Sequence, residues 1–126
     1  MITNNDYTVS VAGMKELEAI IPNFSFPQSY LKIVDLGLVD LENWFLLSDE
    51  LVKNRYIDLK SRYRKRNLIP FAGRYDSDDI ACFETGFDDH VFIIHDFSDE
   101  GWERKQEFDS FWNWFLSAIK ELIGIE

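Results

Sequence analysis

The amino-acid sequence predicts an α+β domain, with a small antiparallel sheet of about four strands, helices packed on one face and a long C-terminal helix. Short apolar runs separated by polar, glycine-containing turns occupy the middle of the 126-residue chain, which is typical of antiparallel strands. Segments with a helical apolar period precede these runs, and a strongly apolar helical segment follows them. Helices grouped around antiparallel strands indicate the α+β class.

Two helices and a strand are predicted in the N-terminal part. From 11 to 21, apolar residues recur on one side of a helix until Pro22 ends it. A second helix is expected to begin at Pro27, which suits a first turn, and to end before Gly37, a typical C-terminal cap. Residues 39–47 alternate at first and then become apolar throughout, which we interpret as a strand.

A third helix is predicted after Ser48, whose hydroxyl can cap the free N–H groups of the first turn. Its apolar stripe has the spacing i, i+4, i+7 and i+11 and consists of Val52, Tyr56, Leu59 and Tyr63. Three strands follow at about 68–72, 80–84 and 91–96, and they are joined by polar loops.

The final helix is expected from about residue 109 to 123, after a polar, acidic loop at 97–107. Its predicted apolar face consists of Phe108, Phe111, Trp112, Phe115, Leu116, Ile119, Leu122 and Ile123. A face of this size should cover one side of the sheet and supply the largest share of the core. Trp44 and Trp112 are both expected in that core.

Length and composition indicate a single domain spanning residues 1–126. Hydrophobic residues make up 46% and aromatic residues 16% of the chain, which excludes a disordered protein. The apolar runs are too short to span a membrane, and the first seven residues lack the features of a signal peptide. We therefore expect no membrane partner. One cysteine, Cys82, allows no internal disulfide and fits a reducing compartment, so we expect a cytoplasmic protein.

The net charge of −10 is concentrated in one part of the chain. Residues 76–109 contain twelve acidic and two basic residues, whereas residues 53–66 contain seven basic and one acidic residue. Such an acidic chain should not bind nucleic acid through its general field, and it suits a basic protein partner. The alternative is that the acidic loops only keep a small domain soluble.

The acidic loops are the predicted partner-binding site. Trp102 lies among acidic residues, and an aromatic side chain ringed by charges is typical of a binding hot spot. The alternative is that Trp102 folds back onto the sheet edge. The predicted site consists of Asp76, Asp78, Asp79, Asp88, Asp89, Asp99, Glu100, Trp102 and Glu103.

No metal and no cofactor are predicted. The segment 76–79 begins like a calcium-binding loop, but Ile80 and Ala81 occupy the positions where such a loop needs a ligand and a glycine. His90 follows two aspartates, but no second histidine lies at ligand spacing. The basic segment 60–66 could contact phosphate, although the net charge favours a helix face that pairs with the acidic loops.

A small hydrolase is the catalytic alternative. Cys82, His95 and Asp96 have the side chains of a nucleophile, a base and an orienting group. However, Cys82 lies in a predicted core strand, where a buried thiol is normally inert. The sequence also lacks a glycine-rich phosphate loop, a Walker motif and a hydrolase elbow. We therefore predict that the protein is not an enzyme.

Three segments carry a family resemblance. The first is 26–31, Phe-Pro-Gln-Ser-Tyr-Leu, with Gly37 soon after; the second is 68–72, Leu-Ile-Pro-Phe-Ala, followed by an acidic loop and a strand at 79–83. The third is the last predicted strand with the terminal helix, which opens on Ser-Phe and continues through aromatic residues to Leu116. Over about residues 14–123 the chain resembles the SUKH superfamily of bacterial immunity proteins and fungal cell-wall-assembly regulators.

The resemblance implies a SUKH-like α+β fold and no enzymatic role. Many bacterial members bind and neutralise a cognate toxin, frequently a nuclease. We therefore expect an immunity protein whose acidic loops bind a basic surface on a toxin. An intracellular regulatory or scaffold module of the same fold is the alternative. Partners differ among members, so the predicted binding residues depend on charge and loop position alone. At 36–38 the chain has Leu-Gly-Leu where the family often has paired glycines.

Overall fold

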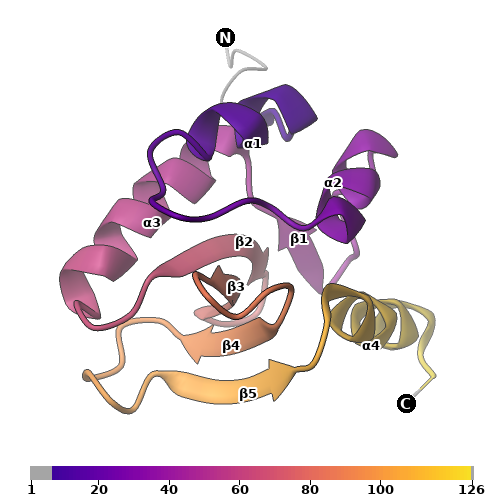
Figure 1. Ribbon diagram of the computed structural model, residues 1–126. Coiled ribbons are helices and arrows are strands. Elements are labelled where there is room, and N and C mark those ends of the chain that lie inside the picture. The colour runs from indigo at the N-terminus through magenta and orange to yellow at the C-terminus, as the bar shows by residue number, and fades with distance from the viewer. Residues whose placement is uncertain (1–6, 126) are drawn as a thin grey trace, which may run out of the picture.

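The computed structural model describes residues 7–125, apart from the side chain of Lys105, and it has an α+β fold (Figure 1). Within these residues the chain forms four helices and five strands. In chain order they are α1 (Val11–Leu17), α2 (Gln28–Asp35), β1 (Trp44–Leu46), α3 (Asp49–Arg62), β2 (Leu68–Arg74), β3 (Asp79–Glu84), β4 (Val91–His95), β5 (Arg104–Phe108) and α4 (Phe111–Ile123). The predicted fold class is confirmed, and the sheet has one strand more than predicted.

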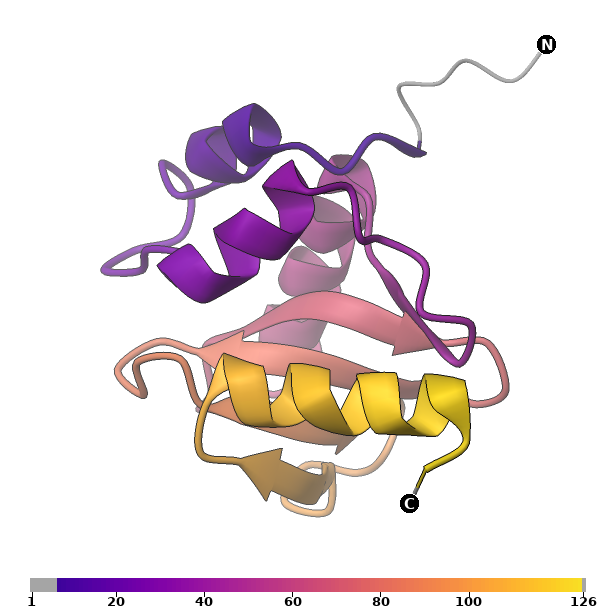
Figure 2. The same cartoon turned by 90° about the vertical axis from the view of Figure 1, so that its right-hand side faces the viewer.

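The sheet is an open antiparallel meander in which each strand pairs with the next along the chain. Asp79 at the start of β3 lies opposite His95 at the end of β4. Because neighbouring strands run in opposite directions, the β2–β3 loop (75–78) and the β4–β5 loop (96–103) lie at one end of the sheet. The β3–β4 loop (85–90) lies at the other end (Figure 2). The topology therefore decides which of the predicted site residues can act together.

Helices cover both faces of the sheet. On one face the rings of Phe71 and Phe83 stack 4.3 Å apart, in contact with Tyr30 of α2 and Phe111 of α4. The opposite face lies under the C-terminal half of α3, and this cluster consists of Leu59, Tyr63, Leu68, Ile80, Cys82, Phe92 and Ile94. Figure 2 shows α4 in front of the sheet and α3 behind it. The expected cover on one face holds for α2 and α4, whereas α1 packs on α2 and α3. α3 covers the second face, so that β3 is buried along its whole length.

The third helix follows the sequence prediction. Its Ser48 side chain accepts a hydrogen bond from the amide of Leu51 at 3.3 Å, as expected of an N-cap. The predicted stripe is buried and consists of Val52, Tyr56, Leu59 and Tyr63. Val52 and Tyr56 belong to the same core as Phe71 and Phe83. Leu59 and Tyr63 pack on the other face of the sheet.

Two strand predictions are corrected. Only Trp44–Leu46 of the predicted strand 39–47 pairs with β2, because the chain turns at 40–43. The predicted loop 97–107 contains β5, which pairs with β4 and has no second neighbour among the described residues. An edge strand with charged and polar side chains has the composition of a loop, so the apolar pattern did not reveal it.

The N-terminal helices are shorter than predicted. α1 ends at Leu17, four residues before the predicted end, and α2 begins at Gln28. Gly37 has a φ of 74°, which suits its predicted place just after the end of α2.

The buried face of α4 differs from the prediction. Its fully buried residues are Phe111, Trp114 and Ala118, whereas Trp112 is 48% exposed and Leu116 is also exposed. The expected burial of Trp112 is therefore wrong, and that of Trp44 is confirmed. Apolar side chains surround most of α4, so the period alone could not decide which side faces the sheet.

In residues 7–125, each helix is too short or too polar to cross a membrane. The prediction that the chain has no signal peptide was made from residues 1–7, of which 1–6 lie outside the described residues.

Candidate functional site

The end of the sheet that holds the β2–β3 and β4–β5 loops brings most predicted site residues together. The amide of Asp96 donates a hydrogen bond to the carbonyl of Asp78 at 3.2 Å, which joins the two loops. Asp79 and His95 join them again, with 2.9 Å between Oδ1 and Nδ1. Five predicted residues are exposed here, and we name this surface the acidic end: Asp76, Asp78, Asp99, Glu100 and Trp102.

The two remaining loop aspartates lie at the opposite end of the sheet. Asp88 is exposed, and the carboxylate of Asp89 accepts a hydrogen bond from the amide of Phe111 at 3.2 Å, at the start of α4. The six residues of β3, or about 20 Å of extended chain, separate these aspartates from the acidic end. They therefore do not belong to one compact surface with the other predicted residues.

Glu103 is buried, and its carboxylate forms hydrogen bonds within the protein. Its two oxygens accept hydrogen bonds from the Gly101 amide at 2.7 Å and from Arg66 at 2.9 Å. Burial raises the pKa of Glu103, but the hydrogen bonds from Arg66 and from the backbone outweigh it, so that the pKa lies below its ordinary value. Glu103 is thus held as an anion inside the protein.

Three arginines fix the β4–β5 loop to α3 and the segment after it. Asp96 is only 3% exposed, and its carboxylate pairs with Arg55 at 3.3 Å and with Arg62. The Tyr63 hydroxyl donates a hydrogen bond to the carbonyl of Ser98 at 2.7 Å. Together with the pair between Arg66 and Glu103, these contacts hold the loop in one conformation. Within the basic segment 60–66, Arg62 and Arg66 pair with the acidic β4–β5 loop, as the alternative to phosphate contact predicts.

The ordered loop presents Trp102 to solvent. Trp102 is 82% exposed, so it does not fold back onto the sheet edge. Its amide donates a hydrogen bond to the carbonyl of Asp99 at 2.9 Å, and Gly101 between them has a φ of 96°, a conformation that favours glycine. The turn is therefore defined by the backbone.

Two more aromatic residues near this end were not singled out in the sequence. Phe97 is 68% exposed and lies 4.6 Å from the guanidinium of Arg62, and Tyr75 is 62% exposed and packs 4.6 Å from Phe45. Their position within loops was the one signal available, because an exposed aromatic side chain cannot be distinguished from a buried one by residue type.

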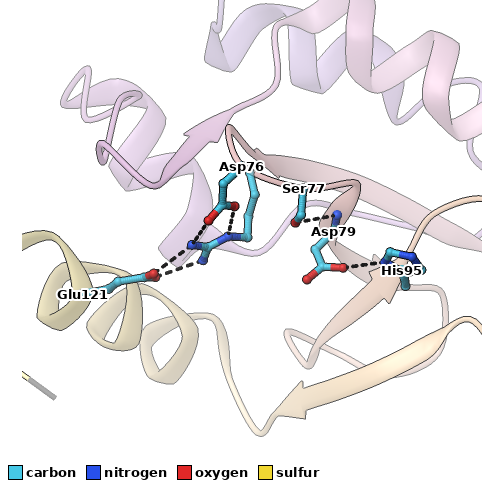
Figure 3. A network of polar contacts seen from close by, with 6 residues as sticks. Asp76, Ser77, Asp79, His95 and Glu121 are labelled. Carbon is cyan, nitrogen blue, oxygen red and sulfur yellow. Dashed lines mark hydrogen bonds and ion pairs between the residues drawn. The ribbon is translucent and has the colours of Figure 1, made fainter.

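Beside the acidic end, a cleft of about 380 Å³ opens between α4 and the sheet. At its rim Arg74 donates hydrogen bonds to both carboxylate oxygens of Glu121 on α4 and to both oxygens of Asp76. The hydrogen bonds to Glu121 and then to Asp76 raise the pKa of Arg74. In Figure 3 the side chains of Asp76 and Glu121 point toward each other, and the Asp79 side chain lies between Ser77 and His95.

The catalytic alternative is not assembled. Cys82 is completely buried, and burial raises the pKa of its thiol well above the ordinary value. It lies opposite Phe92 in the sheet, whereas His95 is three residues further along β4, or about 10 Å away. The carboxylate of Asp96 is engaged by arginines. In the described part of the chain, no group of three or more His, Cys, Asp or Glu side chains is arranged to hold a metal ion.

A scan against protein-family models finds none that matches the chain, and a search of curated proteins finds no significant match. The resemblance to the SUKH superfamily therefore stays a prediction from the residues quoted above.

Proposed function

We propose that this protein is a non-enzymatic immunity protein of the SUKH type, which neutralises a basic toxin by binding it through the acidic end. The observation that carries the proposal is Trp102, which is 82% exposed on a loop that internal contacts hold in place. A large aromatic side chain in such a position has its whole contact area available to a partner.

Order in the loop supports a binding role for Trp102. Tryptophan is among the residues that dominate interface energies, usually at the centre of a ring of less important contacts. A loop that is already fixed by Asp96 and Glu103 loses little conformational entropy when a partner binds. Trp102 can therefore act as an anchor without a costly rearrangement.

Charge supports a basic partner. Asp78, Asp99 and Glu100 are exposed at the same end of the sheet as Trp102, and the whole chain has a net charge of −10. Charges of this sign accelerate the approach of a basic protein. The substrate-binding face of a nuclease is basic because it holds phosphate groups, so an acidic inhibitor can occupy it by matching the charge of the substrate. A nuclease toxin thus fits this surface.

Co-expression with the toxin encoded by a neighbouring gene tests the proposal. The intact chain should restore growth, and the triple variant Asp78→Asn, Asp99→Asn, Glu100→Gln should restore it poorly. The matched control removes the same charge from exposed helix positions, in Glu16→Gln, Asp35→Asn, Glu50→Gln, and should protect fully. Equal protection by both triple variants would refute the acidic end as the binding surface. A partner that is instead a regulatory protein of the same cell would refute the immunity role.

A further inference from the structure

The cleft between α4 and the sheet lies directly behind the β2–β3 loop, so that this loop borders both the acidic end and the cleft. Its lining includes acidic, aromatic and polar side chains from all five strands, from α4 and from this loop. We propose that the cleft binds an arginine side chain of the basic partner. This inference rests on the proposed function and adds to it the chemical group that the partner inserts.

The charge of the lining favours a cation. Among the described lining residues, the three carboxylates of Asp76, Asp79 and Glu121 face one guanidinium, that of Arg74. The Asp79 side chain is only 8% exposed, and its Oδ1 lies 2.9 Å from Nδ1 of His95. A carboxylate in so protected a position interacts more strongly with a bound charge than one in open water.

The protein's own Arg74 shows that this lining suits a guanidinium. Arg74 lies 5.1 Å from the ring of Trp44, and it forms paired hydrogen bonds with Asp76 and with Glu121. An aromatic surface together with carboxylates that accept paired hydrogen bonds is the environment in which guanidinium groups bind best. Trp114 and Phe108 add aromatic rings to the same lining, and Asp79 adds a further carboxylate.

A second observation points to a ligand at this place. Trp114 is 1% exposed and contributes to the lining, and its indole Nε1 has no hydrogen-bond acceptor in the described part of the chain. A buried N–H without an acceptor is destabilising, so a group that supplies one is favoured. An arginine residue within a peptide brings a cationic end for the carboxylates and a backbone carbonyl for the indole. The cleft volume of about 380 Å³ lies in the range of small-ligand sites.

The test uses the full chain labelled with ¹⁵N and the probe Nα-acetyl-arginine N-methylamide, at pH 8, where an ordinary histidine is neutral. We expect saturable shifts of the indole N–H signals of Trp44 and Trp114, with the signals of Trp102 and Trp112 unchanged. The citrulline analogue has the same shape without the charge and should give no saturable shift. Absence of saturation with the arginine probe, or equal binding of the citrulline analogue, would overturn the proposal.

Matched variants locate the site. Asp79→Asn should weaken binding of the probe about tenfold, because it removes one charged hydrogen-bond partner. Asp78→Asn removes the same charge one residue away, at an exposed position, and should change affinity less than about twofold. Glu121→Gln, at a side chain 30% exposed, is a second variant that should also weaken binding. Equal effects of Asp78→Asn and Asp79→Asn would overturn the proposal, because attraction would then come from the general field.

The two proposals fail separately. If the probe does not bind but Trp102→Ala still weakens the partner, only the cleft proposal is wrong. If the probe binds as described but the partner ignores the acidic end, only the proposed function is wrong.

Discussion

The β4–β5 loop has an inner and an outer row of carboxylates, and the two rows have different roles although their residue types are the same. The inner row, Asp96 and Glu103, is buried and paired with arginines. The outer row, Asp99 and Glu100, is exposed, and its carboxylates make no hydrogen bond or ion pair with other described residues. Within this loop, arginine contact and not acidity separates the structural carboxylates from those available to a partner.

The largest expected effect is on the inner row. Asp96→Ala should lower the free energy of unfolding by about 2–3 kcal/mol, because a buried carboxylate that serves Arg55, Arg62 and the amide of Phe97 is lost. Urea unfolding followed by circular dichroism measures this change. Asp99→Ala in the same loop is the control and should change stability by less than about 0.5 kcal/mol. Equal free energies of unfolding for the two variants would show that the buried and the exposed carboxylates do not differ in their contribution to stability.

Trp102 is exposed like the outer carboxylates, so its removal should weaken binding without lowering stability. Trp102→Ala should weaken the toxin complex by about 2 kcal/mol, or about thirtyfold, as expected of a central aromatic anchor. Calorimetric titration measures the affinity. Trp112→Ala, at the half-exposed tryptophan of α4, is the matched control and should bind like the intact chain. Comparable losses in both variants would show that Trp102 is not the anchor.

Neutralising the exposed acids should act mainly on the association rate. The triple variant Asp78→Asn, Asp99→Asn, Glu100→Gln should associate about tenfold more slowly at low ionic strength, and the difference should shrink as salt is added. Stopped-flow fluorescence measures both quantities. If association of the intact chain is independent of salt, electrostatic attraction is not part of recognition.

The smallest effect concerns pH and the inner row. The pKa of Glu103 is lower in the folded protein than in the unfolded chain, so the protein gains stability above the ordinary pKa of about 4.5 and loses it as the pH falls through the lowered value. Glu103→Gln should therefore cost about 1 kcal/mol at pH 7 and almost nothing in stronger acid. Thermal unfolding between pH 3 and 7 measures this difference. A constant difference over that range would show that Glu103 owes its effect to packing.

The sequence predicted what depends on local pattern. The stripe of α3, its Ser48 cap and the strands β2 to β4 each follow from residues close together in the chain, where period and capping chemistry act directly. β5 and the buried face of α4 were missed. Whether residues 104–108 pair as a strand, and which side of α4 packs on the sheet, depend on tertiary contacts and not on the local sequence pattern.

The candidate site was predictable only in composition. The acidic loops were evident, but contacts such as Arg62 with Asp96 and Arg74 with Glu121 join residues 34 and 47 positions apart. No local signal shows which carboxylates such contacts engage. The sequence therefore grouped Glu103 with Glu100, and Asp88 with Asp78, although burial separates the first pair and the length of the sheet separates the second.

Mapping the toxin complex by NMR tests the central claim most directly. On addition of the unlabelled toxin domain to the ¹⁵N-labelled chain, we predict that the largest shift changes fall at 75–79 and 97–102, including the indole signal of Trp102. The loop at 85–90, which contains the equally acidic Asp88 and Asp89, should stay unchanged. Shift changes confined to that loop, or to α1 and α2, would contradict recognition through the acidic end.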